Sequence, residues 1–448
     1  MSWKASGGTV SSTGLYTAPS TTGTFTVTAT SMADSTKSAS ATATVTTATS
    51  DTLPTGLGWH ELSNTSLSSL CPSNLPYFSS IQGDGCNGVI EAWSSGFYDK
   101  NRRQLVIWGG GHVDYGGNEF YAIQLDGNPA FAKRLNDPSS CTGCQVGGAN
   151  QTGNVNDDGS PRSTHTYDAL MYDPVDDVII VPGLHSTYSA SSGDGNVWTL
   201  AKSALPGSGT STGANHTAAP PWSVANTNYL NGTTGGPGAG TGDFDPNTNL
   251  IYYTAANLGP GLYAFNPSGS ATRAGVAPHA VVTINGANAG CYDCTAAVDP
   301  VEKRLYQFGD YVSGGAAGSP FQYWNIDPLS GNYGAVTRLG TPSGCPSFPG
   351  GGPGADWDPV AQMFVVWPSS GNPSTSQLYA YNPSSSSKSY GSISVPANSC
   401  VGLNPAGSAP PSAATNDGTF KRFRYVNYCD CFVVMNDWGQ NAFIVRTR

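Results

Sequence analysis

Charged residues are scarce in this chain, because only 11% of its 448 residues are Asp, Glu, Lys or Arg. Acidic residues outnumber basic ones by 29 to 19, and no run of Lys and Arg occurs. That balance argues against nucleic acid as a partner. No stretch of about 18 apolar residues is present, so the sequence predicts no membrane span. Apolar residues almost never recur at helical spacing, which leaves little room for helices.

Glycine and proline are abundant, with 57 and 32 residues, and short apolar segments alternate with turn residues throughout. This pattern predicts an all-β protein.

Low charge with much Ser, Thr, Gly and Asn is typical of exported proteins, and ten cysteines agree with an oxidising compartment. We therefore expect a secreted or cell-surface protein. Loop length favours disulfides between Cys71 and Cys86 and between Cys345 and Cys400, and the Cys141/Cys144 pair in a long loop is also a disulfide candidate.

A short pattern recurs six times: an aromatic or apolar residue, Asp, usually Pro, a polar turn, and then a burst of apolar strand. The copies begin at Tyr98, Tyr172, Phe244, Val298, Trp357 and, in worn form, Tyr425. After each burst come a Gly- or Ser-rich loop and a second aromatic strand. Each unit is therefore a small antiparallel meander that cannot bury its own faces, and stacking such units around an axis is the usual solution.

The repeat predicts a β-propeller over residues 57–448, with six blades favoured over seven. The segment Trp59 to Leu62 precedes the first meander and has no meander of its own. We expect it to pair with the last strand, around Ala442 to Val445, because such a closure leaves no free edge between the first and last blades.

Residues 1–48 differ from the rest, since they are rich in Ser, Thr and Ala and contain no cysteine. The run from Gly14 to Pro19 and the alternating segments after it resemble the second half of a bacterial Ig-like surface domain. A complete sandwich of that kind needs about seven strands in about 100 residues. We expect a partial Ig-like β segment, followed by a linker over residues 49–56. Its uncovered edges make self-association through this segment a further expectation.

Two classes of propeller loop open on one face: those leading into each innermost strand and those joining the second and third strands. In the first class lie Arg162, His165 and Tyr167. In the second class lie the glycine-rich loop with His112, Tyr115 and Asn118, and the next unit's loop with His185 and Tyr188. Three of the six histidines therefore fall on one face of two neighbouring units.

This set supplies what proton abstraction beside a carboxylate requires: a base, an acid, and a cation to stabilise the enolate. We predict His112, His165, Tyr167 and Arg162 as catalytic residues. The remaining side chains of these loops are the candidates for substrate binding: Tyr115, Asn118, His185 and Tyr188. Eliminations at uronates use this chemistry.

The six meanders and the Gly-Gly-Gly-His loop that ends at His112 resemble the kelch/galactose-oxidase-like propellers of bacterial secreted proteins. Among enzymes they look most like the propeller-fold ulvan lyases. The resemblance covers roughly residues 57–448 and implies that a histidine and a tyrosine at the channel mouth act as acid and base. It also implies an arginine that neutralises the uronate carboxylate, and a structural zinc ion. His112 matches the family's loop histidine.

Cys291 and Cys294 lead into the fourth unit, and His279 lies twelve residues before them. Two cysteines at this spacing with a nearby histidine are a plausible zinc set, and a local disulfide is the alternative. We expect no other cofactor.

Three functions remain open at this point. The first is a carbohydrate-active enzyme, in particular a polysaccharide lyase that cleaves uronate-containing glycans by β-elimination. The second is a non-catalytic adhesion or structural propeller that binds a polysaccharide or cell-surface glycan, since many propellers only bind. The third is a copper-radical oxidase, which needs two Tyr, two His and a Cys crosslinked to Tyr.

Overall fold

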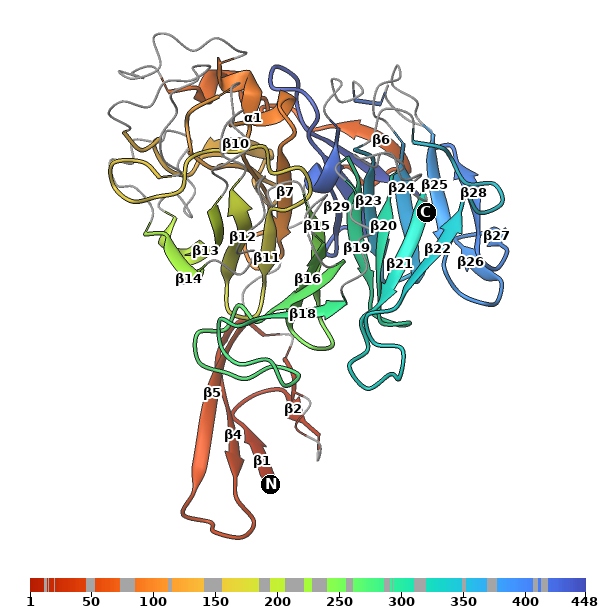
Figure 1. Cartoon of the computed structure of the whole chain (residues 1–448). Coiled ribbons are helices and arrows are strands. Elements are labelled where there is room, and N and C mark those ends of the chain that lie inside the picture. Colours follow the sequence, from red (N-terminus) through yellow and green to blue (C-terminus); the bar gives the residue numbers. More distant parts are fainter. Residues whose placement is uncertain are drawn as a thin grey trace. The chain divides into compact units, whose positions relative to one another are not determined.

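The computed structural model divides the chain into two compact units, Met1–Thr52 and Leu53–Arg448 (Figure 1). It describes residues 1–11, 14, 16–19, 21–45, 53–72, 85–111, 115–140, 155–184, 194–205, 221–227, 240–254, 261–285, 291, 293–309, 320–348, 352–368, 377–405, 410–411 and 418–448. Over these residues the chain is all-β apart from single helical turns: η1 (Ser68–Leu70), η2 (Gly85–Asn87), α1 (Gly88–Glu91), η3 (Lys202–Ala204) and η4 (Phe420–Arg422). No helix in the described segments is long and apolar enough to cross a membrane.

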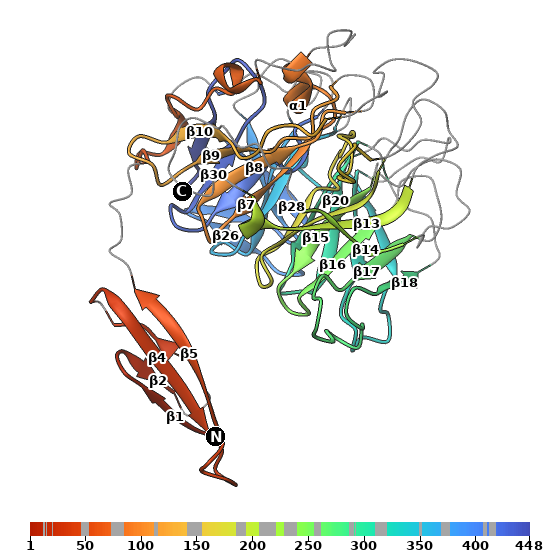
Figure 2. The ribbon, with the colours of Figure 1, turned by 90° about the vertical axis from the view of Figure 1, so that its left-hand side faces the viewer.

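The N-terminal unit is a three-stranded antiparallel sheet with a small two-stranded ladder (Figure 2). The sheet has the order β1 (Ser2–Ala5), β4 (Gly23–Thr30), β5 (Ser38–Val45), and β2 (Thr9–Val10) pairs with β3 (Tyr16–Thr17). None of its described residues is buried. Two aromatic rings lie over glycines, Phe25 against Gly7 and Trp3 against Gly14, where a side chain would collide with the ring. Such a thin layer has no closed core of its own.

Across its described residues the second unit forms six four-stranded antiparallel sheets, and the structure thus confirms the six-bladed β-propeller. The sheets, from the innermost strand outward, are: β7 (Ser95–Asp99), β8 (Gln104–Trp108), β9 (Tyr121–Gln124), β10 (Phe131–Arg134); β11 (Met171–Asp173), β12 (Val178–Leu184), β13 (Asp194–Ala201), β14 (Ser223–Asn226); β15 (Thr241–Asp245), β16 (Leu250–Thr254), β17 (Leu262–Phe265), β18 (Val281–Asn285); β19 (Thr295–Asp299), β20 (Arg304–Phe308), β21 (Phe321–Asn325), β22 (Val336–Gly340); β23 (Gly354–Asp358), β24 (Met363–Trp367), β25 (Leu378–Asn382), β28 (Ser399–Leu403); β29 (Phe423–Val426), β30 (Cys431–Val434), β31 (Phe443–Arg446), β6 (Gly58–Glu61). A small ladder of β26 (Lys388–Tyr390) and β27 (Ile393–Val395) accompanies the fifth sheet.

The innermost strands form a closed ring. They contact one another in the order β7, β11, β15, β19, β23 and β29, and β29 contacts β7 again. Aromatic and branched side chains fill the spaces between neighbouring blades, as where the rings of Phe97 and Tyr172 stack with centroids 4.8 Å apart. Packing between blades therefore supplies the core that no single meander has.

The recurring Asp explains the tight turn that follows the innermost strand in the first five blades. In the fourth blade the Asp299 carboxylate accepts hydrogen bonds from the backbone N–H of Val301 (2.8 Å) and Glu302 (3.1 Å). The residue just before the second strand is left-handed in all six blades, with φ between 48° and 58°: Arg103, Asp177, Asn249, Lys303, Gln362 and Asp430. We call this end of the ring the turn end.

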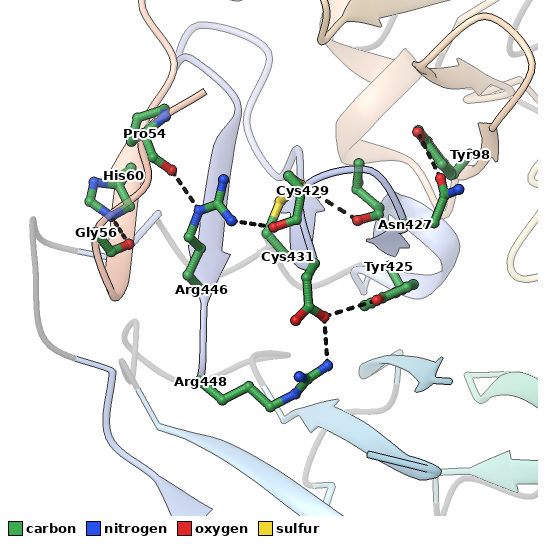
Figure 3. Close-up of a disulfide and its surroundings, with 12 residues drawn as sticks. Pro54, Gly56, His60, Tyr98, Tyr425, Asn427, Cys429, Cys431, Arg446 and Arg448 are labelled. Carbon is green, nitrogen blue, oxygen red and sulfur yellow. Dashed lines mark hydrogen bonds and ion pairs between the residues drawn. A yellow bond between two sulfur atoms is a disulfide. The ribbon is translucent and has the colours of Figure 1, made fainter. Parts of the chain in front are cut away.

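The sixth blade replaces the turn Asp with Val426, and a disulfide between Cys429 and Cys431 flanks its left-handed residue, Asp430. Figure 3 shows this disulfide beside Arg446, which donates to the carbonyl oxygens of Pro54 (2.6 Å) and Cys429. The Cys-x-Cys motif thus constrains a turn that lacks the carboxylate of the other blades.

The predicted closure is confirmed. β6 pairs with β31 in antiparallel register, with Trp59 opposite Val445 and Glu61 opposite Phe443. Trp59 is fully buried and its ring lies 5.3 Å from that of Trp367 in the fifth blade. The first strand of the propeller therefore completes the last blade.

Two predicted disulfides are confirmed, Cys71–Cys86 and Cys345–Cys400. The pair Cys141/Cys144 lies outside the described residues.

Candidate functional site

The loops that lead into the innermost strands meet at the end of the ring opposite the turns, and we call them the lead-in loops. The amide N–H of Tyr167, before β11, donates to the carbonyl of Trp93, before β7, at 2.7 Å. The amide of Thr419, before β29, donates to the carbonyl of Gly352, before β23, at 2.6 Å. Gly352 in turn donates to Asp293, before β19. These backbone contacts fix the loops of neighbouring blades to one another.

Three aromatic residues of these loops have left-handed backbones: Trp93 (φ 42°), Tyr167 (φ 47°) and Phe420 (φ 48°). This conformation is unfavourable for bulky side chains, and such strain concentrates where a particular side-chain placement is needed. The three loops belong to the sixth, first and second blades, which are adjacent in the ring. Strained aromatic residues therefore gather on one sector of the lead-in end.

The rings of this sector form one cluster with His165. The imidazole of His165 lies 4.6 Å from the Trp93 ring and 5.9 Å from the Tyr167 ring, the latter edge-on at 81°. Tyr167 also packs edge-on against Phe420 at 6.0 Å. His165 is buried, with 6% of its surface exposed, while Trp93 and Tyr167 are half-buried. We call Trp93, Arg162, His165 and Tyr167 the lead-in mouth.

The glycine-rich loop of the first blade lies directly against this mouth. The hydroxyl of Ser163 donates to the carbonyl of Gly109 at 2.9 Å. A Cβ atom on Gly111 would stand 2.0 Å from the carbonyl of Ser163, so only glycine permits this approach. The two loop classes thus meet on one face. His112 follows Gly111 in the chain and lies outside the described residues, as do His185 and Tyr188.

Arg162 is half-buried in the same loop as His165 and Tyr167. Burial lowers the pKa of its guanidinium from the ordinary value. A guanidinium with reduced access to water interacts more strongly with a carboxylate than an exposed one does.

Two predicted substrate-binding residues are instead buried in the scaffold. Asn118 is 1% exposed, and its side-chain amide donates to Ser139 Oγ, Ser160 Oγ and the carbonyl of Pro161 at 3.0–3.2 Å. It therefore joins the glycine-rich loop to the loop of the second blade. Its burial is at odds with the predicted substrate contact.

Tyr115 is also 1% exposed, and its hydroxyl donates to Glu119 Oε1 at 2.5 Å. Tyr121 donates to the same oxygen at 2.7 Å. Burial raises the pKa of the Glu119 carboxyl, and the two phenols only partly offset that effect. Tyr115 thus supports the loop from the interior.

The predicted zinc residues do not form a ligand set in this structure. Cys291 and Cys294 are joined in a disulfide, which leaves neither thiolate for a metal. His279 sits in a turn with a left-handed backbone, φ 53°, and its ring lies over Gly269. Among the described residues no group of three His, Cys, Asp or Glu side chains is arranged to hold a metal. Zinc at these cysteines would require the reduced pair and stays a prediction.

A charged network beneath the mouth was not predicted from the sequence. Asp168, directly after Tyr167, is fully buried and lies 3.3 Å from the ammonium of Lys421, which follows Phe420. Asp168 also accepts from the Thr295 hydroxyl (2.6 Å) and the Ala296 amide (3.0 Å). Burial raises the pKa of Asp168 to about 6, although Lys421 acts in the opposite direction.

The network continues along the ring axis through Arg424. Its guanidinium lies 3.6 Å from Asp243 and 3.2 Å from Asp356, which come from two different innermost strands. The charges are paired across blades far apart in sequence. No local motif marks such a network, which explains why sequence reasoning missed it.

The sequence matches no protein-family model and no curated protein. The solved structures that resemble the chain include three at low identity. An auxiliary nutrient-binding protein of Bacteroides thetaiotaomicron is 9% identical with a TM-score of 0.43, over 95% of this chain and 83% of that one. A luciferin-regenerating enzyme is 11% identical (TM-score 0.36; 80% and 92% covered), and the Malassezia sympodialis allergen Mala s 1 is 11% identical (TM-score 0.35; 80% and 93% covered). The propeller itself is established by the six sheets described above.

Proposed function

We propose that the protein is an extracellular carbohydrate-active propeller whose lead-in mouth binds uronate-containing polysaccharide and cleaves it by β-elimination. The observation that carries this proposal is the cluster of His165 and Tyr167 on Trp93, with Arg162 in the same loop. An aromatic ring can cover the C–H face of a sugar, and a guanidinium can pair with its carboxylate.

The reaction needs no group beyond those of the mouth. Arg162 pairs with the uronate carboxylate and stabilises the charge that develops on it. One member of the His165–Tyr167 pair removes the proton from the carbon beside the carboxylate. The electron pair left on that carbon forms a carbon–carbon double bond as the bond to the glycosidic oxygen breaks. The other member protonates that oxygen, and the two chain ends separate.

One observation favours a second candidate, glycan binding without cleavage. His165 is only 6% exposed and lies under the Trp93 ring, whereas a base must reach its substrate. In that case Trp93 and Arg162 alone would hold the glycan, and the protein would serve adhesion or capture.

The test incubates the full chain with alginate, polygalacturonate, glucuronan and ulvan and follows the ultraviolet absorbance of unsaturated uronate. We expect turnover on at least one polymer and a loss of about 10²–10⁴-fold in kcat for Tyr167→Phe, which removes only the hydroxyl. Arg162→Met should raise KM and also lower kcat, because Arg162 both pairs with the uronate carboxylate and stabilises the charge that develops on it. The matched control is Tyr381→Phe in the fifth blade, where the lost hydroxyl donates to Asn398 and turnover should stay unchanged.

Each other outcome has a definite meaning. Retention of a polymer in affinity electrophoresis, abolished by Trp93→Ala and unaccompanied by unsaturated product, would establish the binding alternative. Products without a double bond would indicate hydrolysis instead. Failure to bind or cleave any of the four polymers would reject the proposal.

A further inference from the structure

The turn end of the ring contains a cavity of about 380 Å³. One position of the repeat contributes a lining residue from all six blades, the next-to-last residue of each innermost strand. Five blades place an aromatic ring there and one places a valine: Tyr98, Tyr172, Phe244, Val298, Trp357 and Tyr425. The cavity therefore has an aromatic wall in which nearly every blade takes part, and its volume falls in the range of small-molecule sites.

Charged side chains line the same cavity: two carboxylates, Asp243 and Asp356, and three cations, Lys100, Lys421 and Arg424, of which Lys100 is exposed to solvent. The charges of the other four groups cancel when all are ionised, and water screens the charge of the exposed Lys100. Because Lys421 and Arg424 already lie in ion pairs, a neutral ligand is favoured over an ion, which would unbalance those pairs.

The carboxylates are held by backbone groups. Asp356 accepts from the amides of Tyr425 (2.7 Å) and Trp357 (2.9 Å), and Asp243 accepts from the amide of Val298 (3.3 Å). These bonds fix the acceptors at the base of the cavity, because the donors belong to innermost strands.

Lys421 and Arg424 differ from the carboxylates, because they have donors that are buried and not hydrogen-bonded. Lys421 Nζ, Arg424 Nε and Arg424 Nη1 have no hydrogen-bond partner within the described part of the chain, although they lie near carboxylates as ion pairs. The neighbouring carboxylates do not meet these donors in hydrogen-bond geometry, which is unfavourable for buried donors. An acceptor oxygen in the cavity would satisfy them.

We propose that the turn end binds a neutral saccharide of one or two rings. Sugar hydroxyls can accept from Lys421 and Arg424 and donate to Asp243 or Asp356, while the aromatic wall covers the C–H faces of the ring. This site lies at the opposite end of the innermost strands from the lead-in mouth and takes an uncharged ligand. It is independent of the proposed elimination.

The test is calorimetric titration of the full chain with neutral monosaccharides and disaccharides of glucose, galactose and mannose. At least one should bind, and Phe244→Ala should weaken it about tenfold, since a stacked ring is lost from the wall. Val298→Phe, which narrows the cavity, should weaken disaccharides more than monosaccharides. Phe131→Ala on the outermost strand of the first blade, β10, is the matched control and should leave the affinity unchanged.

A second measurement uses the unaltered protein, so that a poorly folded variant leaves the proposal testable. A sugar that carries a photoreactive diazirine should label peptides that contain residues 97–100, 171–174, 243–246 or 356–359. Labelling confined to residues 162–167 would overturn the proposal, as would the absence of binding by every neutral sugar. The two sites are distinguished by Tyr167→Phe, which should lose uronate cleavage and keep its affinity for the neutral sugar.

Discussion

The two ends of the ring use the same unusual backbone conformation in different ways. At the turn end the six left-handed residues are all polar, and they occupy the same position of the repeat. At the lead-in end the left-handed residues Trp93, Tyr167 and Phe420 are all aromatic and belong to loops that differ in length and sequence. The strain of the first set is a shared property of a turn, whereas that of the second is specific to three adjacent blades. The left-handed residues of the turn end therefore follow from the repeat, whereas those of the lead-in end follow from the side-chain placement that the candidate site needs.

Arg422 at the lead-in end and Arg424 at the turn end differ in whether their donors are used within the protein. Arg422 at the lead-in end is fully buried and donates to the carbonyls of Ser94 (2.5 Å), Met435 (2.9 Å) and Gly418 (2.7 Å). Its role is to bind the loops of the sixth and first blades together. Arg424, two residues later, lines the turn-end cavity and has donors that make no hydrogen bond in the described residues.

The largest effect on stability is expected from removing the Arg422 side chain, which joins the loops of the sixth and first blades. Arg422→Ala leaves several buried carbonyls without donors and should lower the free energy of unfolding by about 3–5 kcal/mol. Urea denaturation measures the loss. Arg338→Ala on the exposed strand β22 is the control and should change stability by no more than about 0.5 kcal/mol. Equal losses in the two variants would contradict the role assigned to Arg422.

Asp168 should make the stability of the lead-in end depend on pH. Its pKa is about 6 in the folded protein against an ordinary value of 3.8, so the folded state binds the proton more tightly. The stabilisation from the protonated carboxyl is fully present below pH 3.8 and is lost as pH rises through about 6. Asp243 and Lys421 face the same group and bias it in opposite directions.

Asp168→Asn removes this titration while keeping a side chain of the same shape. The stability of the natural protein relative to the variant should therefore fall by about 1–3 kcal/mol between pH 4 and pH 7. Urea denaturation of both proteins at several pH values measures the difference. A difference that is constant or that grows with pH would show that burial does not raise the pKa of Asp168.

Much of the fold followed from the sequence because its determinants are local. The turn Asp and the apolar burst after it mark each meander, and the orphan segment at Trp59 marks the closing strand. The meeting of Arg162, His165 and Tyr167 with the glycine-rich loop also followed from loop class. Which side chains become buried depends on the whole fold, however, and cannot be read from the local sequence. Asn118 has the composition of a binding residue, but its amide is fully used in joining two loops.

The charged network escaped prediction for the same reason. Asp168 and Lys421 are separated by most of the propeller and meet only because the ring closes. Left-handed aromatic residues are equally hard to foresee, since propensity argues against them at each position. The Cys-x-Cys motif alone does not explain the Cys429–Cys431 bond. The repeat explains it, because the turn of the sixth blade lacks the Asp that the other five blades have.

The smallest effect is expected at the turn end, where each of the six blades has one left-handed residue at the same position. Gln362→Gly places glycine at a left-handed position, φ 52°, and should stabilise the propeller by about 0.5–1 kcal/mol. Asn249→Gly should gain less, because Asn tolerates this conformation. Thermal unfolding of both variants tests the comparison. Destabilisation by Gln362→Gly would mean that its contact with Lys388 outweighs the backbone strain.

The pairing of β6 with β31 also sets an order of events during biosynthesis. The ribosome makes β6 before any other strand of the propeller and makes β31 last. Until β31 emerges, Trp59 has no partner strand, and the edge of the sixth blade stays open to pairing with other chains. The ring can thus close only after synthesis of the propeller is nearly complete, and chaperones would be needed most in that interval.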